Sequence, residues 1–63
     1  MQSTALVTDL LLEPKEAAAI LKVSLSWLAK ARMRDEGPPF IRIGRCIRYS
    51  NVALFRWLKS QER

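Results

Sequence analysis

The fold is decided by residues 13–31, which read EPKEAAAILKVSLSWLAKA. Pro14 suits the first position of a helix, where its missing N–H costs nothing, and strong helix formers follow it. The pair at 22–23 interrupts this pattern, and Ser24 is a good N-cap for a second helix. The stretch therefore predicts two short helices joined by a tight turn.

The apolar residues of this stretch are spaced so that the two helices can pack on each other. The inward positions are Ala17, Ile20 and Leu21 in the first helix and Val23, Leu28 and Ala31 in the second. Ala18 supplies the small side chain that a close helix crossing needs, and the second helix is expected to end at Met33 or Arg34. Such a pair can place its second helix in the major groove of DNA, although a plain helical hairpin has the same pattern.

The rest of the chain predicts a β-hairpin and a third helix. The sequence DEGPP at 35–39 breaks the helical pattern, and Gly44 lies between two stretches typical of strands. Alternation predicts one strand face with Ile41, Ile43, Ile47 and Tyr49 and another with Arg42, Cys46 and Arg48. Ser50 or Asn51 is expected to cap a last helix with an inward stripe of Leu54, Trp57 and Leu58.

We therefore expect one domain, mainly α-helical with a small β-hairpin. Its order is helix, turn, helix, hairpin wing, helix, which is a winged helix–turn–helix. We assign residues 10–59 to this domain, residues 1–9 to a flexible N-terminal arm and residues 60–63 to a C-terminal tail. The start of the domain, 10–12, is expected to be an edge strand or a segment packed across the core, and Leu6 and Val7 of the arm could dock on a neighbouring copy.

Composition argues against catalysis. A chain of 63 residues is too small to enclose a deep substrate pocket. It has no histidine and one cysteine, Cys46, which excludes an intrachain disulfide and a zinc site of the usual Cys/His kind. No glycine loop that could hold phosphates is present. We expect no enzymatic activity, no cofactor, no metal and no small-molecule substrate.

The N-terminal residues 1–5 lack the features of a secretory signal, and no apolar run approaches the ~20 residues that span a bilayer. We therefore expect a cytoplasmic protein with no membrane partner. Charge is uneven within the net +5: residues 1–29 carry two lysines and three acids, whereas residues 30–63 carry nine basic and three acidic residues. This basic half indicates a polyanion partner, and a solvated basic surface is the alternative.

The second helix would offer a row of side chains to a major groove. The row consists of Ser24, Leu25, Ser26, Ala29, Lys30 and Met33. Arg42, Arg45 and Arg48 recur every three residues across the hairpin, with Arg45 at its tip. Such a wing can reach phosphates or enter a narrow minor groove, where arginine is favoured. Trp27 is expected to cover the rim of the core, with partner binding as the alternative.

The chain resembles the excisionase-like family of small winged helix–turn–helix proteins, which is related to MerR-type DNA-binding domains and includes AlpA-like phage regulators. The resemblance covers about residues 10–58. It rests on LLEPKEAAAILKVS at 11–24, WLAKARMR at 27–34, GPPFIRIGR at 37–45, IRY at 47–49 and the closing helix. Lys22 departs from the family, which often has glycine there, and a positive φ at this residue would cost about 1 kcal/mol.

The resemblance implies that the second helix enters the major groove and that the hairpin contacts the neighbouring minor groove or backbone. By position it assigns Ser24, Ser26, Lys30 and Arg34 to the helix side, and Arg42, Arg45 and Arg48 to the wing. It also implies a bacterial or phage-encoded, nucleoid-associated protein that acts as an excisionase, which is a recombination directionality factor.

We therefore expect sequence-specific binding to double-stranded DNA. The excisionase would act architecturally with a tyrosine or serine integrase and with further copies of itself on a phage or integrative element. One alternative is an AlpA-like transcriptional regulator that uses the same module. Another is a protein-interaction module with a basic docking face. RNA binding is less favoured, because the sequence shows no aromatic platform on which bases could stack.

Overall fold

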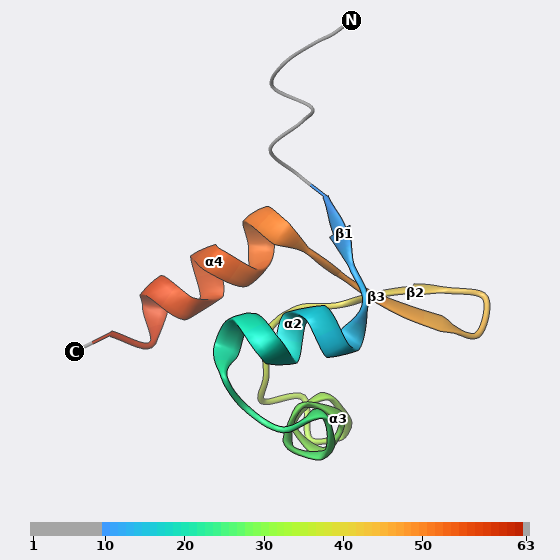
Figure 1. Ribbon diagram of the computed structural model, residues 1–63, viewed down its shortest axis with the longest axis horizontal. Helices are drawn as coiled ribbons and strands as arrows, with labels where there is room; N and C mark the ends of the chain where they lie inside the picture. The colour runs from blue at the N-terminus through green and yellow to red at the C-terminus, as the bar shows by residue number, and fades with distance from the viewer. Residues whose placement is uncertain (1–9, 63) are drawn as a thin grey trace, which may run out of the picture.

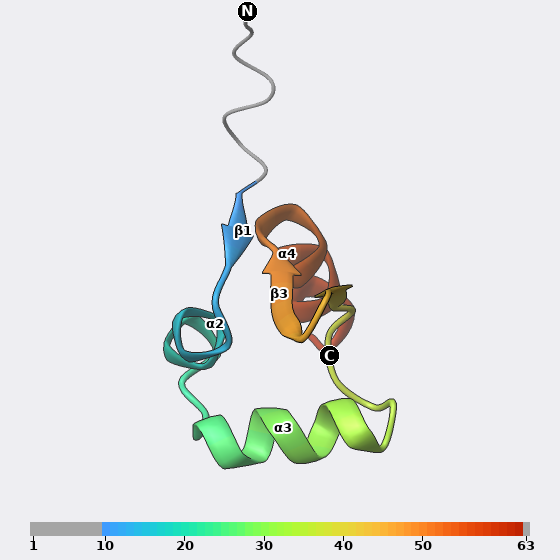
Figure 2. The same cartoon turned by 90° about the vertical axis from the view of Figure 1, so that its right-hand side faces the viewer.

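The computed structural model describes residues 10–62 (Figures 1 and 2). Its elements are β1 (Leu11–Leu12), α2 (Pro14–Leu21), α3 (Leu25–Met33), β2 (Ile41–Ile43), β3 (Cys46–Ser50) and α4 (Asn51–Ser60). This order confirms the expected winged helix–turn–helix. The expectations for the arm at 1–9, including Leu6 and Val7, lie outside the described residues. No helix within 10–62 is long and apolar enough to cross a membrane.

The three helices begin where local signals in the sequence predict. Pro14 is the first residue of α2, and the Oε1 atom of Glu16 accepts the backbone N–H of Glu13 at 2.7 Å. The Ser24 hydroxyl accepts the backbone N–H of Trp27 at 2.9 Å, and the Ser50 hydroxyl accepts that of the third residue of α4 at 3.2 Å. Each bond satisfies a backbone donor that the helix itself leaves without a partner.

Left-handed residues close the ends of α2 and α3. Lys22 has a φ of 58°, and the N–H of the next residue donates to the Ala18 carbonyl at 3.0 Å. Asp35 has a φ of 59°, and the N–H of the next residue donates to the Ala31 carbonyl at 2.9 Å. Both hydrogen bonds are the 6→1 bond of a Schellman motif. The sequence raised a positive φ only as a condition for Lys22, where the structure has it, and did not raise it for Asp35.

The strands form an antiparallel sheet in the order β1-β3-β2. β1 pairs with β3 through Leu11 opposite Ser50 and Leu12 opposite Tyr49, which confirms the expected edge strand. Within the hairpin, Ile41 pairs with Arg48, Arg42 with Ile47 and Ile43 with Cys46. Gly44 has a φ of 61° and takes the first position of the two-residue turn. Glycine is favoured there because such turns require a positive φ at that position.

The predicted faces of the hairpin are wrong. Directly opposite residues of an antiparallel pair lie on the same face, and a two-residue turn places 43 opposite 46. The outer face therefore carries Leu11, Ile41, Ile43, Cys46 and Arg48, and the inner face carries Leu12, Arg42, Ile47 and Tyr49. Exposure agrees with this register, since Ile43 is 51% exposed and Tyr49 is fully buried.

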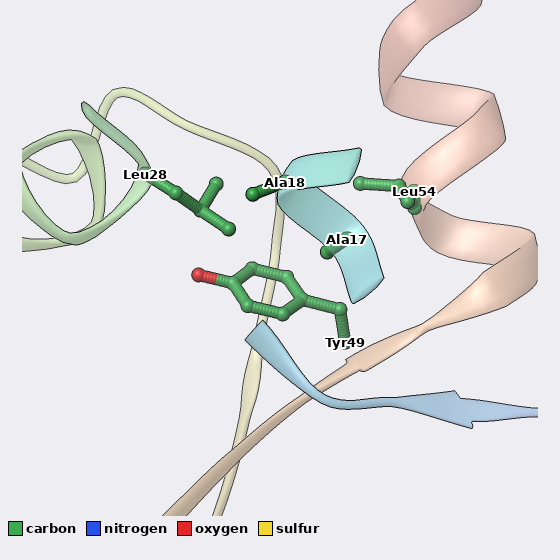
Figure 3. Close-up of a cluster of buried hydrophobic side chains, with 5 residues drawn as sticks. All are labelled: Ala17, Ala18, Leu28, Tyr49 and Leu54. Atoms are coloured by element: carbon green, nitrogen blue, oxygen red, sulfur yellow. The ribbon is translucent and has the colours of Figure 1, made fainter. Parts of the chain in front are cut away.

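All three helices and β3 contribute to the core (Figure 3). It consists of Ala17, Ala18, Leu28, Tyr49 and Leu54, with Leu12, Leu21, Val23, Phe40 and Ile47 packed against it. The inward placement of Leu28 is confirmed, and Ala18 is buried in the same cluster. Two other expectations are wrong: Ile20 is 37% exposed and Trp57 is half-buried, and neither belongs to the core cluster. Trp27 is exposed at the edge of the core, as expected.

Gly37 holds the connection between α3 and β2 close to the helix. A Cβ atom at this position would lie 2.9 Å from the Cβ of Ala31, a separation that real Cβ atoms essentially never show. Pro38, the next residue, is buried. The chain that leaves α3 therefore turns back across the helix before it enters the hairpin.

Candidate nucleic-acid interface

The helix α3 lies along one side of the molecule, with no other element beyond it (Figure 2). Its buried residues, Leu28 and Ala31, face the core. At about 100° per residue, the opposite side of the helix carries Ser26, Ala29, Lys30 and Met33. Met33 is 84% exposed. The structure thus brings four of the six predicted helix residues, Ser26, Ala29, Lys30 and Met33, onto one outward row.

At the start of α3, part of the hydrogen-bonding capacity of Ser24 is used to cap the helix. The Ser24 hydroxyl oxygen accepts the Trp27 N–H, which leaves the hydroxyl hydrogen available to an outside acceptor. Leu25 is 53% exposed on the flank of the helix rather than on its outward row. The N-terminal end of α3 can therefore contact an anion through the hydroxyl of Ser24 and an apolar group through Leu25.

Lys30 and Arg34 border a shallow hollow on the side of α3 that faces α4. The hollow has a volume of about 240 Å³, and its lining also includes Trp27, Trp57 and Gln61. An adjoining apolar hollow shares both tryptophans. Arg34 follows the last residue of α3, so its position is set by the end of that helix. The two basic groups therefore lie together on the α4 flank of the predicted reading helix.

The hairpin projects to one side of α2 and α4 to the other (Figure 1). The helix α3 is seen end-on in Figure 1, where the hairpin lies in the plane, and Figure 2 shows the reverse arrangement. The wing therefore runs across the direction of α3. A duplex with one groove along α3 would place its neighbouring backbone near the wing.

The three wing arginines are not equivalent. Arg42 and Arg45 are exposed, with Arg42 on the inner face and Arg45 in the turn. Arg48 is half-buried on the outer face, and its Nη1 donates to the Ile47 carbonyl at 2.8 Å. The regular spacing of the arginines in the sequence does not reveal this difference, because the two-residue turn changes which residues share a face.

Sequence reasoning missed Arg32. Its Nη1 donates to the hydroxyl oxygen of Tyr49 at 2.9 Å, and its Cζ lies 5.8 Å from the ring centroid of Phe40. The rings of Phe40 and Tyr49 are 6.4 Å apart and tilted by 55°. The partners are 8 and 17 residues away in the chain, so local helical patterns give no sign of this cluster.

A family model described as a helix-turn-helix domain matches residues 11–62. The chain belongs to this family. Its helix–turn–helix is the unit α2–turn–α3, and the matched region also includes the hairpin and α4. No curated protein and no solved structure matches the chain significantly.

The helix-turn-helix domain identifies the protein as a DNA-binding protein. In helix–turn–helix domains the second helix is the one typically placed in the major groove, and the second helix of this unit is α3.

Proposed function

We propose that the protein is a sequence-specific double-stranded DNA-binding protein that acts as an excisionase, a recombination directionality factor of a phage or integrative element. It would work architecturally with a tyrosine or serine integrase and with further copies of itself. The observation that carries this proposal is the chemistry of α3. Its outward row of Ser26, Ala29, Lys30 and Met33 contains no arginine, asparagine or glutamine, which are the strongest base readers.

A single copy therefore discriminates weakly between sequences. Ala29 and Leu25 can meet thymine methyl groups, and Lys30 can meet a guanine or a phosphate. Affinity comes mainly from phosphate contacts, which carry no direct sequence information. Several copies on neighbouring sites would make such a module selective, and this is the arrangement that an architectural role requires.

Within this proposal the wing supplies backbone or minor-groove contacts through Arg42 and Arg45. Both side chains are exposed, and Arg45 lies in the turn. We expect Arg48 to contribute less to DNA binding than these two, because it is half-buried and hydrogen-bonded to a carbonyl of the wing itself. Ser24 and Arg34 extend the contact at the two ends of α3.

Mobility-shift and footprinting assays across the attachment region of the host element test the proposal. We expect Lys30→Ala to reduce discrimination between sequences if Lys30 meets a base, by about 1–3 kcal/mol. Arg45→Ala and Arg42→Ala should weaken binding to all sequences and reduce the salt slope by about 1 each. Arg48→Ala should have the smallest effect of the three arginine variants. Lys59→Ala, an exposed change on α4, is the matched control.

Three outcomes would contradict parts of this proposal. Absence of duplex binding at low salt, with capture of an acidic protein instead, would favour the protein-interaction alternative. A single isolated half-site without DNA bending would count against the architectural mechanism. Specific binding that changes transcription but leaves integrase-mediated excision unaffected would favour the AlpA-like regulator.

A further inference from the structure

Arg32 connects the reading helix to the wing strand. It lies in the last turn of α3, and its Nη1 donates to the hydroxyl of Tyr49 on β3 at 2.9 Å. Its guanidinium also lies over the ring of Phe40, the residue that immediately precedes β2. One side chain of α3 thus touches residues associated with both strands of the hairpin.

The partner in this bond is held in the core. Tyr49 is fully buried, and its ring lies among the core residues of α2, with the hydroxyl directed toward α3 (Figure 3). The hydroxyl of a buried tyrosine normally needs a hydrogen-bond partner, and Arg32 provides it here. A hydrogen bond to a charged group is about twice as strong as one between neutral groups.

The position of Arg32 on the helix argues against a direct DNA contact. It is half-buried and lies about 100° around the helix from the exposed Met33, on the flank toward the hairpin. Its guanidinium already interacts within the protein, with the hydroxyl oxygen of Tyr49 and the ring of Phe40. The other basic residues near the end of α3, Lys30 and Arg34, are exposed and border the opposite flank.

We propose that Arg32 and Tyr49 form a positioning pair that fixes the orientation of α3 relative to the hairpin. This inference rests on the proposed use of both elements in DNA binding. The pair holds the major-groove helix and the wing at the separation that allows both to contact one duplex. Without the pair, α3 and the hairpin still fold, but DNA binding by α3 no longer brings the hairpin into contact with the duplex.

Tyr49→Phe is the decisive variant, because it removes only the hydroxyl and keeps the buried ring. We expect it to weaken specific DNA binding by about tenfold, because only about a tenth of the free protein then holds α3 and the hairpin in the orientation that binds. Arg32→Lys should have a similar effect, because lysine keeps the charge but lacks the planar guanidinium. Arg56→Lys, at an exposed position of α4, is the matched control and should bind as the wild type does.

A double-mutant cycle distinguishes positioning from general destabilisation. Arg45→Ala should weaken binding by about tenfold in the wild type and by less than about threefold in the Tyr49→Phe background. The effect is smaller there because a misplaced wing already contributes little to the affinity. The cycle is measured at a temperature where circular dichroism shows every variant to be folded. Full additivity of the two substitutions would overturn the proposal.

The free protein gives an independent readout. Residual dipolar couplings of backbone amides should fit one common orientation for α3 and the hairpin in the wild type, and two separate orientations in Tyr49→Phe. Unchanged couplings would overturn the positioning role. So would wild-type affinity of Tyr49→Phe combined with a salt slope lowered by about 1 in Arg32→Gln, which would make Arg32 a phosphate contact. Failure of the wild type to bind DNA would refute the proposed function and still leave this measurement decisive for the pair.

Discussion

At the scale of single residues, the turn between α2 and α3 depends on a conformation that its side chain disfavours. Lys22 has a φ of 58°, which places it in the left-handed region where a Cβ atom meets the following carbonyl. The residue is exposed, so no packing of its side chain offsets this strain. The backbone bonds at 3.0 and 3.2 Å that close the end of α2 hold it there.

Replacement of Lys22 by glycine should therefore raise the free energy of unfolding by about 0.5–1 kcal/mol, since glycine adopts a positive φ without a steric penalty. Urea denaturation followed by circular dichroism measures the change. Lys22→Ala is the matched control, because it removes the charge and the long side chain but keeps the Cβ atom. An equal gain in stability from both variants would show that charge, and not backbone strain, accounts for the effect.

At the scale of elements, the hairpin is defined by its two-residue turn. The turn pairs Ile43 with Cys46, so the face of every residue in β3 follows from it. Ile43 is 51% exposed on the outer face, whereas Ile47 is partly buried against the core. Two isoleucines four residues apart therefore have different energetic roles.

This register predicts a clear difference between two matched substitutions. Ile43→Thr should change the free energy of unfolding by no more than about 0.5 kcal/mol, as is usual for an exposed position. Ile47→Thr should cost about 1–2 kcal/mol, because it removes apolar contact with the core. Threonine keeps a β-branched side chain in both cases, so strand propensity changes little. Equal costs in chemical denaturation would contradict the register.

Sequence alone predicts the elements well because their signals are local. Pro14, Ser24 and Ser50 mark helix starts, and Gly44 marks the turn, all within a few residues of what they determine. The faces of the hairpin were predicted wrongly because Ile43 was grouped with Ile47, whereas a two-residue turn puts Ile43 opposite Cys46 and on the same face as it.

The link between Arg32 and Tyr49 is not predictable from local patterns, since tertiary packing joins residues 17 positions apart. Trp57 illustrates the same limit. Its spacing in α4 indicates a core residue, but the structure leaves it half-buried beside a hollow that Trp27 also lines. The outward row of α3 was largely predictable, because helical periodicity alone defines it once Leu28 is buried.

At the scale of the whole molecule, stability depends on very few side chains. Among residues 10–62, the large side chains that are fully buried are Tyr49, Leu28 and Leu54, and each comes from a different element. A domain of this size typically has a free energy of unfolding of roughly 3–9 kcal/mol. Loss of one large core side chain therefore removes a large share of the total.

Leu28→Ala should cost about 2–5 kcal/mol and shift much of the population to the unfolded state at 37 °C. Thermal denaturation monitored by circular dichroism measures this change. Leu25→Ala, at a position 53% exposed in the same helix, is the matched control and should change stability by no more than about 0.5 kcal/mol. A fully folded Leu28→Ala protein with unchanged melting temperature would contradict the importance of this small core.

The position of β2 at the edge of the sheet has a consequence for the protein away from DNA. Within the described part of the chain, the strand Ile41–Ile43 pairs with β3 alone, and it carries two exposed isoleucines on its outer face. Such an edge is a template for pairing with another chain. Its three-residue length and the charge of Arg42 oppose self-association, and high salt screens that charge. Concentrated solutions of the free protein are therefore safest against aggregation at low ionic strength, under the same conditions that strengthen its binding to DNA.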